Sequence, residues 1–148
     1  MSPIQYRPYR ASDLHQAAHI WFESWRSSGV SAPDPVTELG LLERFEREAE
    51  SGWSVVVAER GDLLVGFMAL KASEGILDQL FVLSTAQRQG VGAHLLSLAA
   101  HTMPRGFHLR TAADNTGARR FYELQGLTLD RLEPHPTNSH VTAIYRWG

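Results

Sequence analysis

Residues 80–92 read LFVLSTAQRQGVG, from Leu80 to Gly92. The first part is apolar and typical of a buried strand, and a helical pattern of apolar residues begins at Val91. Between them lies a polar turn that contains Arg88 and ends in two glycines. The stretch therefore predicts a strand that passes through a loop into a helix, as in an α/β fold.

The start of the predicted helix is suited to bind an anion. The first backbone N–H groups of a helix have no partners within it, and the helix dipole places partial positive charge there. Gly90 and Gly92 keep side chains away from these N–H groups, and Arg88 adds a forked, permanently charged donor. Such a loop suits a phosphate or diphosphate. The alternative is that Gly-Val-Gly only forms a tight corner.

Two known nucleotide-binding motifs do not fit this loop. The dinucleotide-binding pattern requires a third glycine where Leu95 stands, and the phosphate-binding loop of the Gly-Lys-Ser type requires a lysine that is absent here. The predicted anion site therefore belongs to neither class.

Apolar periodicity and turn residues divide the rest of the chain into strands and helices. Ser12 or Asp13 is expected to cap the first helix. Strand–helix–strand connections after residue 76 imply parallel pairing there, whereas the preceding strands are joined by tight turns and form an antiparallel meander. We therefore expect a mixed sheet in one domain. The predicted elements are a strand at 4–7, a helix at 14–25, a loop at 29–35, a helix at 36–51, strands at 53–59, 63–70 and 76–83, a helix at 90–102, a strand at 106–111, a helix at 115–125, and strands at 127–132 and 141–147.

Composition excludes several classes of protein. The chain has 148 residues, the length of one domain. It contains no cysteine, which rules out disulfides, thiolate metal sites and cysteine nucleophiles. The net charge of −2 argues against a nucleic-acid binder that works by bulk charge. No apolar segment is long enough for a membrane helix and the start has no signal-peptide pattern, so we expect a soluble, cytoplasmic protein without a membrane partner.

Two segments resemble the GCN5-related N-acetyltransferase (GNAT) superfamily. The first is Gln87-Arg88-Gln89-Gly90-Val91-Gly92, which is similar to the family pattern Gln/Arg-x-x-Gly-x-Gly/Ala. The second runs from Asn115 through Phe121-Tyr122 to Gly126-Leu127, where Leu127 replaces the usual phenylalanine. The order of elements along almost the whole chain also fits. The resemblance implies one N-acetyltransferase domain over residues 1–148, with a mixed, mostly antiparallel sheet flanked by helices.

The resemblance also implies that acetyl-CoA is the acyl donor. In the family, the strand before the loop splays away from its parallel neighbour and its backbone binds the pantetheine arm, which maps onto Leu80, Phe81 and Val82. The loop amides bind the diphosphate, which maps onto Gln87, Arg88, Gln89, Gly90, Val91, Gly92 and Ala93. Asn115 contacts the pantetheine or holds the following turn.

Direct acetyl transfer needs two kinds of proton-handling group. An amine with a pKa near ~10.4 is only about one part in 10³ neutral at pH 7, so a group must accept a proton, directly or through water. The leaving thiolate benefits from a donor, and the resemblance places Tyr122 near the sulfur as the general acid; the alternative is a structural tyrosine. Asp78 is the candidate base or water-orienting group, with Glu23 and Glu133 as weaker candidates. Alternation is expected to place Asp78, Leu80 and Val82 on one face of their strand.

Other candidate residues lie on the predicted helices. His15, His19 and Glu23 have a spacing that could bind a metal, but a polar helix stripe is the preferred interpretation, and no metal is expected. Trp21 and Trp25 could line an acceptor pocket, or pack in the core. Arg88, Arg119 and Arg120 are candidates for the 3′-phosphate of CoA, and the sequence does not decide whether His140 faces the cleft.

We therefore predict an acetyl-CoA-dependent N-acetyltransferase that acts on a primary amine, with a weak preference for a small molecule over a peptide. The alternatives are a non-catalytic CoA-binding regulatory module and a protein or aminoacyl-tRNA acetyltransferase; the last would favour a basic surface. The sequence leaves open which amine is the acceptor, which group is the base, and whether the chain forms a homodimer, as family members often do through their last strands.

Overall fold

The strands and helices follow one another in the predicted order. The structure is a computed structural model that describes residues 3–28, 36–135 and 140–148. The predicted loop at 29–35 lies outside these residues. Most boundaries agree with the predicted ones within three residues. The elements are β1 (Ile4–Pro8), α1 (Leu14–Ser27), α2 (Glu38–Ser51), β2 (Ser54–Arg60), β3 (Leu63–Lys71), β4 (Ile76–Val82), α3 (Val91–Thr102), β5 (Phe107–Ala112), α4 (Thr116–Leu124), β6 (Thr128–Pro134) and β7 (Val141–Trp147).

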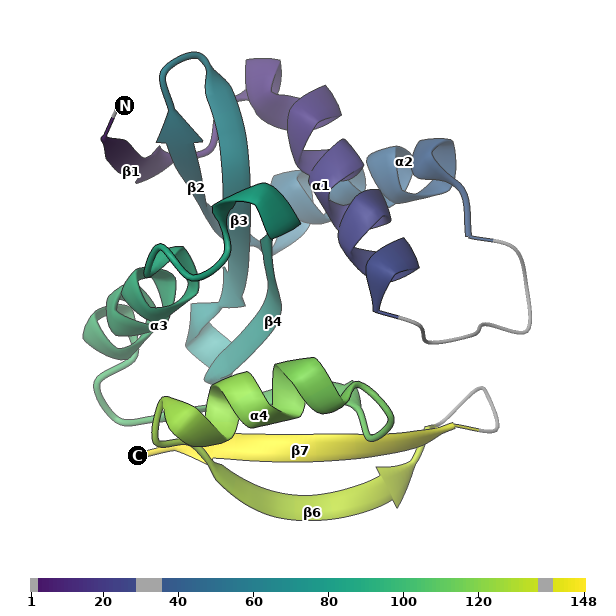
Figure 1. Cartoon of the computed structure of the whole chain (residues 1–148), viewed down its shortest axis with the longest axis vertical. Coiled ribbons are helices and arrows are strands. Elements are labelled where there is room, and N and C mark those ends of the chain that lie inside the picture. The colour runs from purple at the N-terminus through teal and green to yellow at the C-terminus, as the bar shows by residue number, and fades with distance from the viewer. Residues whose placement is uncertain (1–2, 29–35, 136–139) are drawn as a thin grey trace.

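The strands of the described residues form one sheet in the order β1-β2-β3-β4-β5-β7-β6 (Figure 1). Every neighbouring pair is antiparallel except β4 and β5, which are parallel because α3 crosses between them. The prediction of a mixed, mostly antiparallel sheet flanked by helices is therefore confirmed.

Separate apolar clusters cover the two faces of the sheet. On one face, α3 and α4 pack through residues such as Leu95, Leu96 and Tyr122. On the other face, α1 and α2 enclose aromatic side chains, among which Phe45 and Phe67 are fully buried. Large apolar side chains buried on both faces account for the stability of this layered arrangement.

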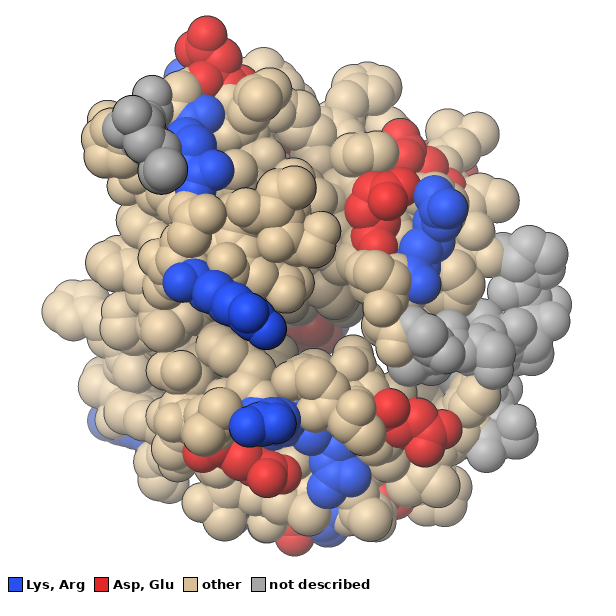
Figure 2. All heavy atoms as spheres, viewed as in Figure 1, with Lys and Arg blue, Asp and Glu red and all other residues tan. Residues whose placement is uncertain are grey.

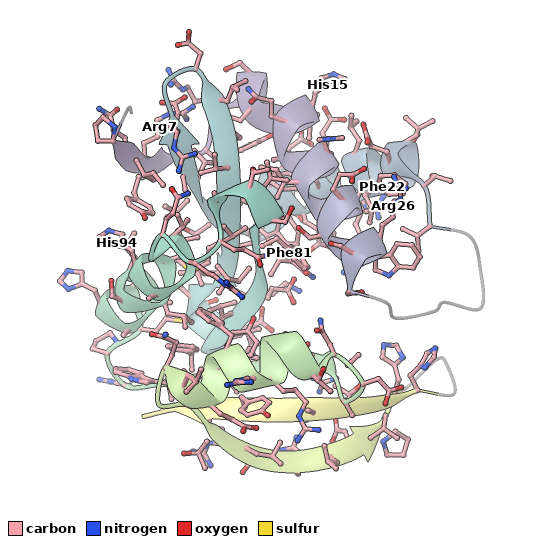
Figure 3. The ribbon with its side chains drawn as sticks, viewed as in Figure 1. Arg7, His15, Phe22, Arg26, Phe81 and His94 are labelled. Atoms are coloured by element: carbon pink, nitrogen blue, oxygen red, sulfur yellow. The ribbon has the colours of Figure 1, made fainter. Side chains whose placement is uncertain are left out.

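Asp13 is the N-cap residue of α1, one of the two predicted, but its side chain makes no capping hydrogen bond. Its carboxylate accepts two hydrogen bonds from the guanidinium of Arg7, at 2.8 and 2.9 Å, and one from the backbone N–H of Arg10 at 2.9 Å. Arg7 also pairs with Glu59 on β2 at 2.9 Å, and it lies beside β2 in Figure 3. The bidentate ion pair with Arg7 engages both carboxylate oxygens, so Asp13 joins β1 to the start of α1 instead.

A β-bulge breaks the alternation of β4 at Asp78. Leu70 of β3 pairs with Leu77, whereas the preceding Ala69 pairs with Gln79, so Asp78 has no partner across the pair. Leu77, Leu80 and Val82 consequently lie on the face covered by α3 and α4, while Asp78 bonds Trp53, which belongs to the cluster beneath α1 and α2. The prediction that Asp78 shares a face with Leu80 and Val82 is therefore wrong, because an extra residue reverses the side-chain direction.

Within residues 3–28, 36–135 and 140–148, none of the helices combines the length and the apolar character needed to cross a membrane.

Candidate functional site

A cavity lies where β4 and β5 separate. These parallel strands pair only at their first residues, Ile76 with His108. The cavity measures about 720 Å³, within the range of ~300–1,000 Å³ usual for small-molecule sites. Its walls come from β4, β5, the start of α3, α4 and the end of α1. Figure 2 shows this hollow with basic side chains on either side and an acidic side chain at its floor.

The loop before α3 presents backbone N–H groups without acceptors. Among the described residues, nothing accepts a hydrogen bond from the N–H groups of residues 88–93. Arg88 and Gly90 have φ of 67° and 81°, and such left-handed residues within a turn can aim neighbouring N–H groups at one anion. A non-glycine residue with positive φ is strained, and such residues cluster at active sites, ligand-holding loops and switch regions. The loop is therefore a candidate anion site at one end of the cavity.

The two glycines of this loop have different roles. A Cβ on Gly90 would meet no atom within 4 Å, so space does not require a glycine there. The positive φ of this residue does favour one. A Cβ on Gly92 would lie 2.8 Å from Cζ of Phe121, so its glycine makes room for a ring from α4. Besides the predicted role of keeping side chains away from the N–H groups, Gly92 therefore sets how closely α4 approaches α3.

The two glutamines of the loop point to different partners. Gln87 lines the cavity, and its Nε2 donates to the carbonyl of Val82 at 3.1 Å, which ties the loop to the end of β4. Gln89 accepts from Arg60 and donates to the carbonyl of Thr85 at 3.4 Å. Of the residues predicted to hold the pantetheine arm and the diphosphate, Gln89 is the one that does not line the cavity. The other predicted residues that do are Asp78, Leu80, Phe81, Val82, Arg88, Gly90, Val91, Gly92, Ala93, Asn115 and Tyr122.

The edge of β4 that faces β5 is free beyond the single pair with His108. On its other edge, β4 pairs with β3 as far as Val82. Phe81 of β4 lies near the centre of the molecule (Figure 3). An unpaired strand edge next to a cavity offers N–H and C=O groups to an extended ligand that carries amides.

Tyr122 places a phenol in the cavity wall. Its residue is 8% exposed, and its ring contacts those of Phe121 and Tyr145. No described residue makes a hydrogen bond with its hydroxyl. Burial raises the pKa of Tyr122 well above its usual value, because the anionic form would lose its solvation. The hydroxyl therefore stays protonated at neutral pH and can donate a hydrogen bond.

Asn115 caps α4, which matches one of the two roles that the resemblance allowed. Its Oδ1 accepts from the N–H of Ala118 at 3.2 Å, and the residue also lines the cavity. The cap fixes where α4 begins and therefore where Tyr122, two turns later, is held.

The structure leaves fewer candidates among the three arginines predicted to bind the 3′-phosphate of CoA. The Nε of Arg119 donates to the hydroxyl of Tyr145 at 3.0 Å, and its Nη1 donates to the carbonyl of Ala113 at 3.2 Å. Arg119 is therefore committed to joining α4 to β7. Arg88, which lines the cavity, and Arg120, which is exposed, keep their guanidinium groups available.

The candidates on α1 are mostly structural. Trp21 is 5% exposed and packs among Phe45, Trp53 and Phe67, so it belongs to the core. Glu23 pairs with Arg26 at 3.0 Å. Phe22, which carries the Arg26 guanidinium 5.5 Å from its ring centre, lies with it on the C-terminal half of α1 (Figure 3).

The side chains on α1 whose spacing could bind a metal make other contacts. His19 contacts Glu38 of α2 at 2.9 Å. In the described part of the chain, no group of three or more histidine, aspartate or glutamate side chains could hold a metal ion. Trp25 does not line the cavity; neither does Glu133, which pairs with Arg110 at 3.4 Å and Arg131 at 3.0 Å.

Several residues of the cavity wall were missed by sequence reasoning. Ser24, Ser27 and Ser28 from the end of α1 and Arg110 and Thr111 from β5 line the cavity. Neither group carries a motif. The serines reach the site because α1 packs near the split between β4 and β5, and the β5 residues reach it because that split exposes the edge of β5.

Comparison with known proteins gives a consistent result. The pattern of the Acetyltransferase (GNAT) family matches residues 14–127. A probable N-acetyltransferase of Mycobacterium tuberculosis, Rv2775, is 28% identical over 143 residues, which cover 87% of this chain and 82% of that protein.

Solved structures share the fold at lower identity. YncA of Salmonella typhimurium, whose structure contains its cofactor acetyl-CoA, has a TM-score of 0.73 and 15% identity and covers 99% of this chain and 94% of its own. PaiA N-acetyltransferase of Thermoplasma acidophilum, in complex with coenzyme A, has a TM-score of 0.75 and 19% identity and covers 98% of this chain and 99% of its own. At these identities the likeness establishes a common fold.

Proposed function

The chain belongs to the acetyltransferase (GNAT) family, and we propose that it transfers the acetyl group of acetyl-CoA directly to a primary amine, with a small molecule as the acceptor. One observation carries the proposal: the N–H groups of residues 88–93, which have no acceptor among the described residues, lie in a loop at the wall of a cavity that continues along the free edge of β4. A diphosphate followed by an arm that contains amides has the chemistry that these two features would bind. The same coenzyme, with or without the acetyl group, is bound in structures of the same fold.

The residues present fit acetyl-CoA from its diphosphate to its thioester. The N–H groups of residues 88–93 and the Arg88 guanidinium would hold the diphosphate. The free edge of β4 between Leu80 and Val82 would bind the pantetheine amides. When bound, acetyl-CoA supplies an activated acetyl group and a thiolate leaving group.

In the proposed reaction, the amine nitrogen bonds to the acetyl carbon and the carbon–sulfur bond breaks. Tyr122, which lines the cavity, donates its proton to the departing sulfur and regains one from solvent. The proton lost by the amine passes to Asp78 or to water that Asp78 orients. Asp78 is the one carboxylate among the described residues of the cavity wall. Holding both reactants in one cavity supplies a further part of the rate enhancement.

The proposal is tested by calorimetry with acetyl-CoA and by a thiol-release assay with a panel of amines. The panel contains small primary amines, lysine peptides and peptides with free N-termini. We expect binding of acetyl-CoA, and turnover with at least one small amine. Tyr122→Phe should lower kcat by about 10-fold to 10³-fold while the protein stays folded. Tyr9→Phe is the matched control, because Tyr9 packs against Phe45, away from the cavity.

Other outcomes would count against the proposal. Equal turnover of Tyr122→Phe and wild type would remove the role of the phenol. Binding without turnover across the whole panel would favour a CoA-binding regulatory module, and turnover with peptides alone would favour a protein acetyltransferase. Absence of binding heat, together with no effect of a bulky residue at Gly90, would contradict the CoA site itself. A cytoplasmic location and a single domain over residues 1–148 stay predictions.

A further inference from the structure

Trp53 donates a hydrogen bond to Asp78, the proposed base in the cavity wall. Trp53 precedes β2 and is 7% exposed, and its Nε1 donates to Oδ2 of Asp78 at 2.8 Å. Trp53 does not line the cavity, whereas Asp78 does. The indole therefore reaches the cavity only through the carboxylate of Asp78.

The surroundings of Trp53 make its position rigid. Its ring lies 5.6 Å from that of Trp21 and 5.2 Å from that of Phe45, which it meets edge to face. Rings packed in this way have little freedom to turn, so the direction of the indole N–H is fixed by the core. A buried N–H of this kind requires an acceptor, and Asp78 supplies it.

The β-bulge of β4 brings Asp78 to that N–H. Because Asp78 is the extra residue between Leu77 and Gln79, its side chain turns to the face of α1 and α2, where Trp53 lies. Only Oδ2 of the carboxylate has a hydrogen bond with a described residue. Oδ1 is therefore left to interact with a molecule in the cavity.

We infer that Trp53 is a positioning residue that holds the Asp78 carboxylate with one oxygen bound and the other directed to the acceptor amine. The inference rests on the proposed function, because it assigns the free oxygen to the acceptor. A bound carboxylate has fewer rotamers available, so less ordering is required when the amine binds. Trp53 itself takes up no proton and touches no substrate.

The test compares Trp53→Phe with Trp21→Phe. Both variants shorten a buried indole in the same aromatic cluster, but only Trp53 is bonded to Asp78. With the best amine of the panel, Trp53→Phe should lower kcat by about 10-fold to 100-fold and leave the KM for acetyl-CoA unchanged. Trp21→Phe should change kcat by less than about threefold. Combined with Asp78→Asn, Trp53→Phe should add little, because Trp53 acts only through the carboxylate that Asp78→Asn removes.

A second measurement does not depend on turnover or on the Trp53 variant being well folded. In a ¹⁵N–¹H spectrum, the indole N–H resonance of Trp53 should move strongly in Asp78→Asn, while those of the other three tryptophans stay in place. An unmoved Trp53 resonance would overturn the inference. A kcat for Trp53→Phe equal to that of Trp21→Phe would also overturn it. So would a double variant whose fold-loss in kcat equals the product of the fold-losses of Trp53→Phe and Asp78→Asn. If the wild type neither binds acetyl-CoA nor turns over any amine, the proposed function fails instead, and the resonance still reports whether the contact exists.

Discussion

The contact between Gly92 and Phe121 predicts that the effect of Gly92→Ala on the free energy of unfolding depends on the Phe121 ring. Gly92 lies in the first turn of α3, and Phe121 lies on α4 next to Tyr122. A Cβ built on Gly92 would lie 2.8 Å from Cζ of the ring and 3.3 Å from Cε1. Ordinary contacts of this kind begin near 3.4 Å, so the ring would have to retreat by about 0.6 Å.

Two opposing effects set the size of the change in Gly92→Ala. Forcing a methyl group into a packed site costs about 1–3 kcal/mol. Alanine is the better helix former by about 1 kcal/mol, which offsets part of that cost. We therefore expect a net loss of about 0–2 kcal/mol in the free energy of unfolding. Because Phe121 precedes Tyr122, we also expect weaker binding of acetyl-CoA and a lower kcat.

The decisive experiment is a double-mutant cycle with Phe121→Leu. Leucine lacks the far end of the ring, so in that background Gly92→Ala should become neutral or stabilising, with a coupling energy of about 1–3 kcal/mol. Urea unfolding at constant pH measures each corner of the cycle. Gly90→Ala is the contrasting variant: its Cβ meets no atom, but its φ of 81° costs about 1–2 kcal/mol in any background. A Gly92→Ala penalty that is the same with and without the Phe121 ring would refute the reasoning.

Two further predictions concern stability. The Arg7 guanidinium holds the pKa of Asp13 below its usual value, so the stability that this ion pair contributes is present above pH ~3.9, the pKa in the unfolded chain, and is lost as pH falls through the lower pKa of the folded state. Asp13→Asn should be less stable than wild type in urea at pH 7, and the difference in unfolding free energy should shrink below pH ~3.9. Thr37 caps α2 by accepting from the N–H of Gly40 at 3.0 Å, so Thr37→Ala should lose about 0.5–2 kcal/mol of unfolding free energy and Thr37→Ser should lose much less; equal urea midpoints for the two variants would contradict the cap.

The order of elements could be read from the sequence because it depends on local signals. Apolar residues recur with the period of a strand or a helix, and turn residues such as Gly61-Asp62 separate them. The loop from Gln87 to Gly92 is also local, since the proposed anion site consists of the backbone of one turn and the start of one helix. For the same reason, the position of Tyr122 in the cavity follows from a motif contained within α4 and its cap.

Features that depend on pairing between distant segments were decided by the tertiary structure. The bulge at Asp78 arises from the register between β3 and β4, and a shift of one residue reverses the face of every side chain before it. The contact of Asp78 with Trp53 joins residues 25 positions apart, and the commitment of Arg119 to Tyr145 joins residues 26 apart. Such contacts leave no periodic trace in the sequence, because each one depends on where two whole elements are placed by the packing of the sheet.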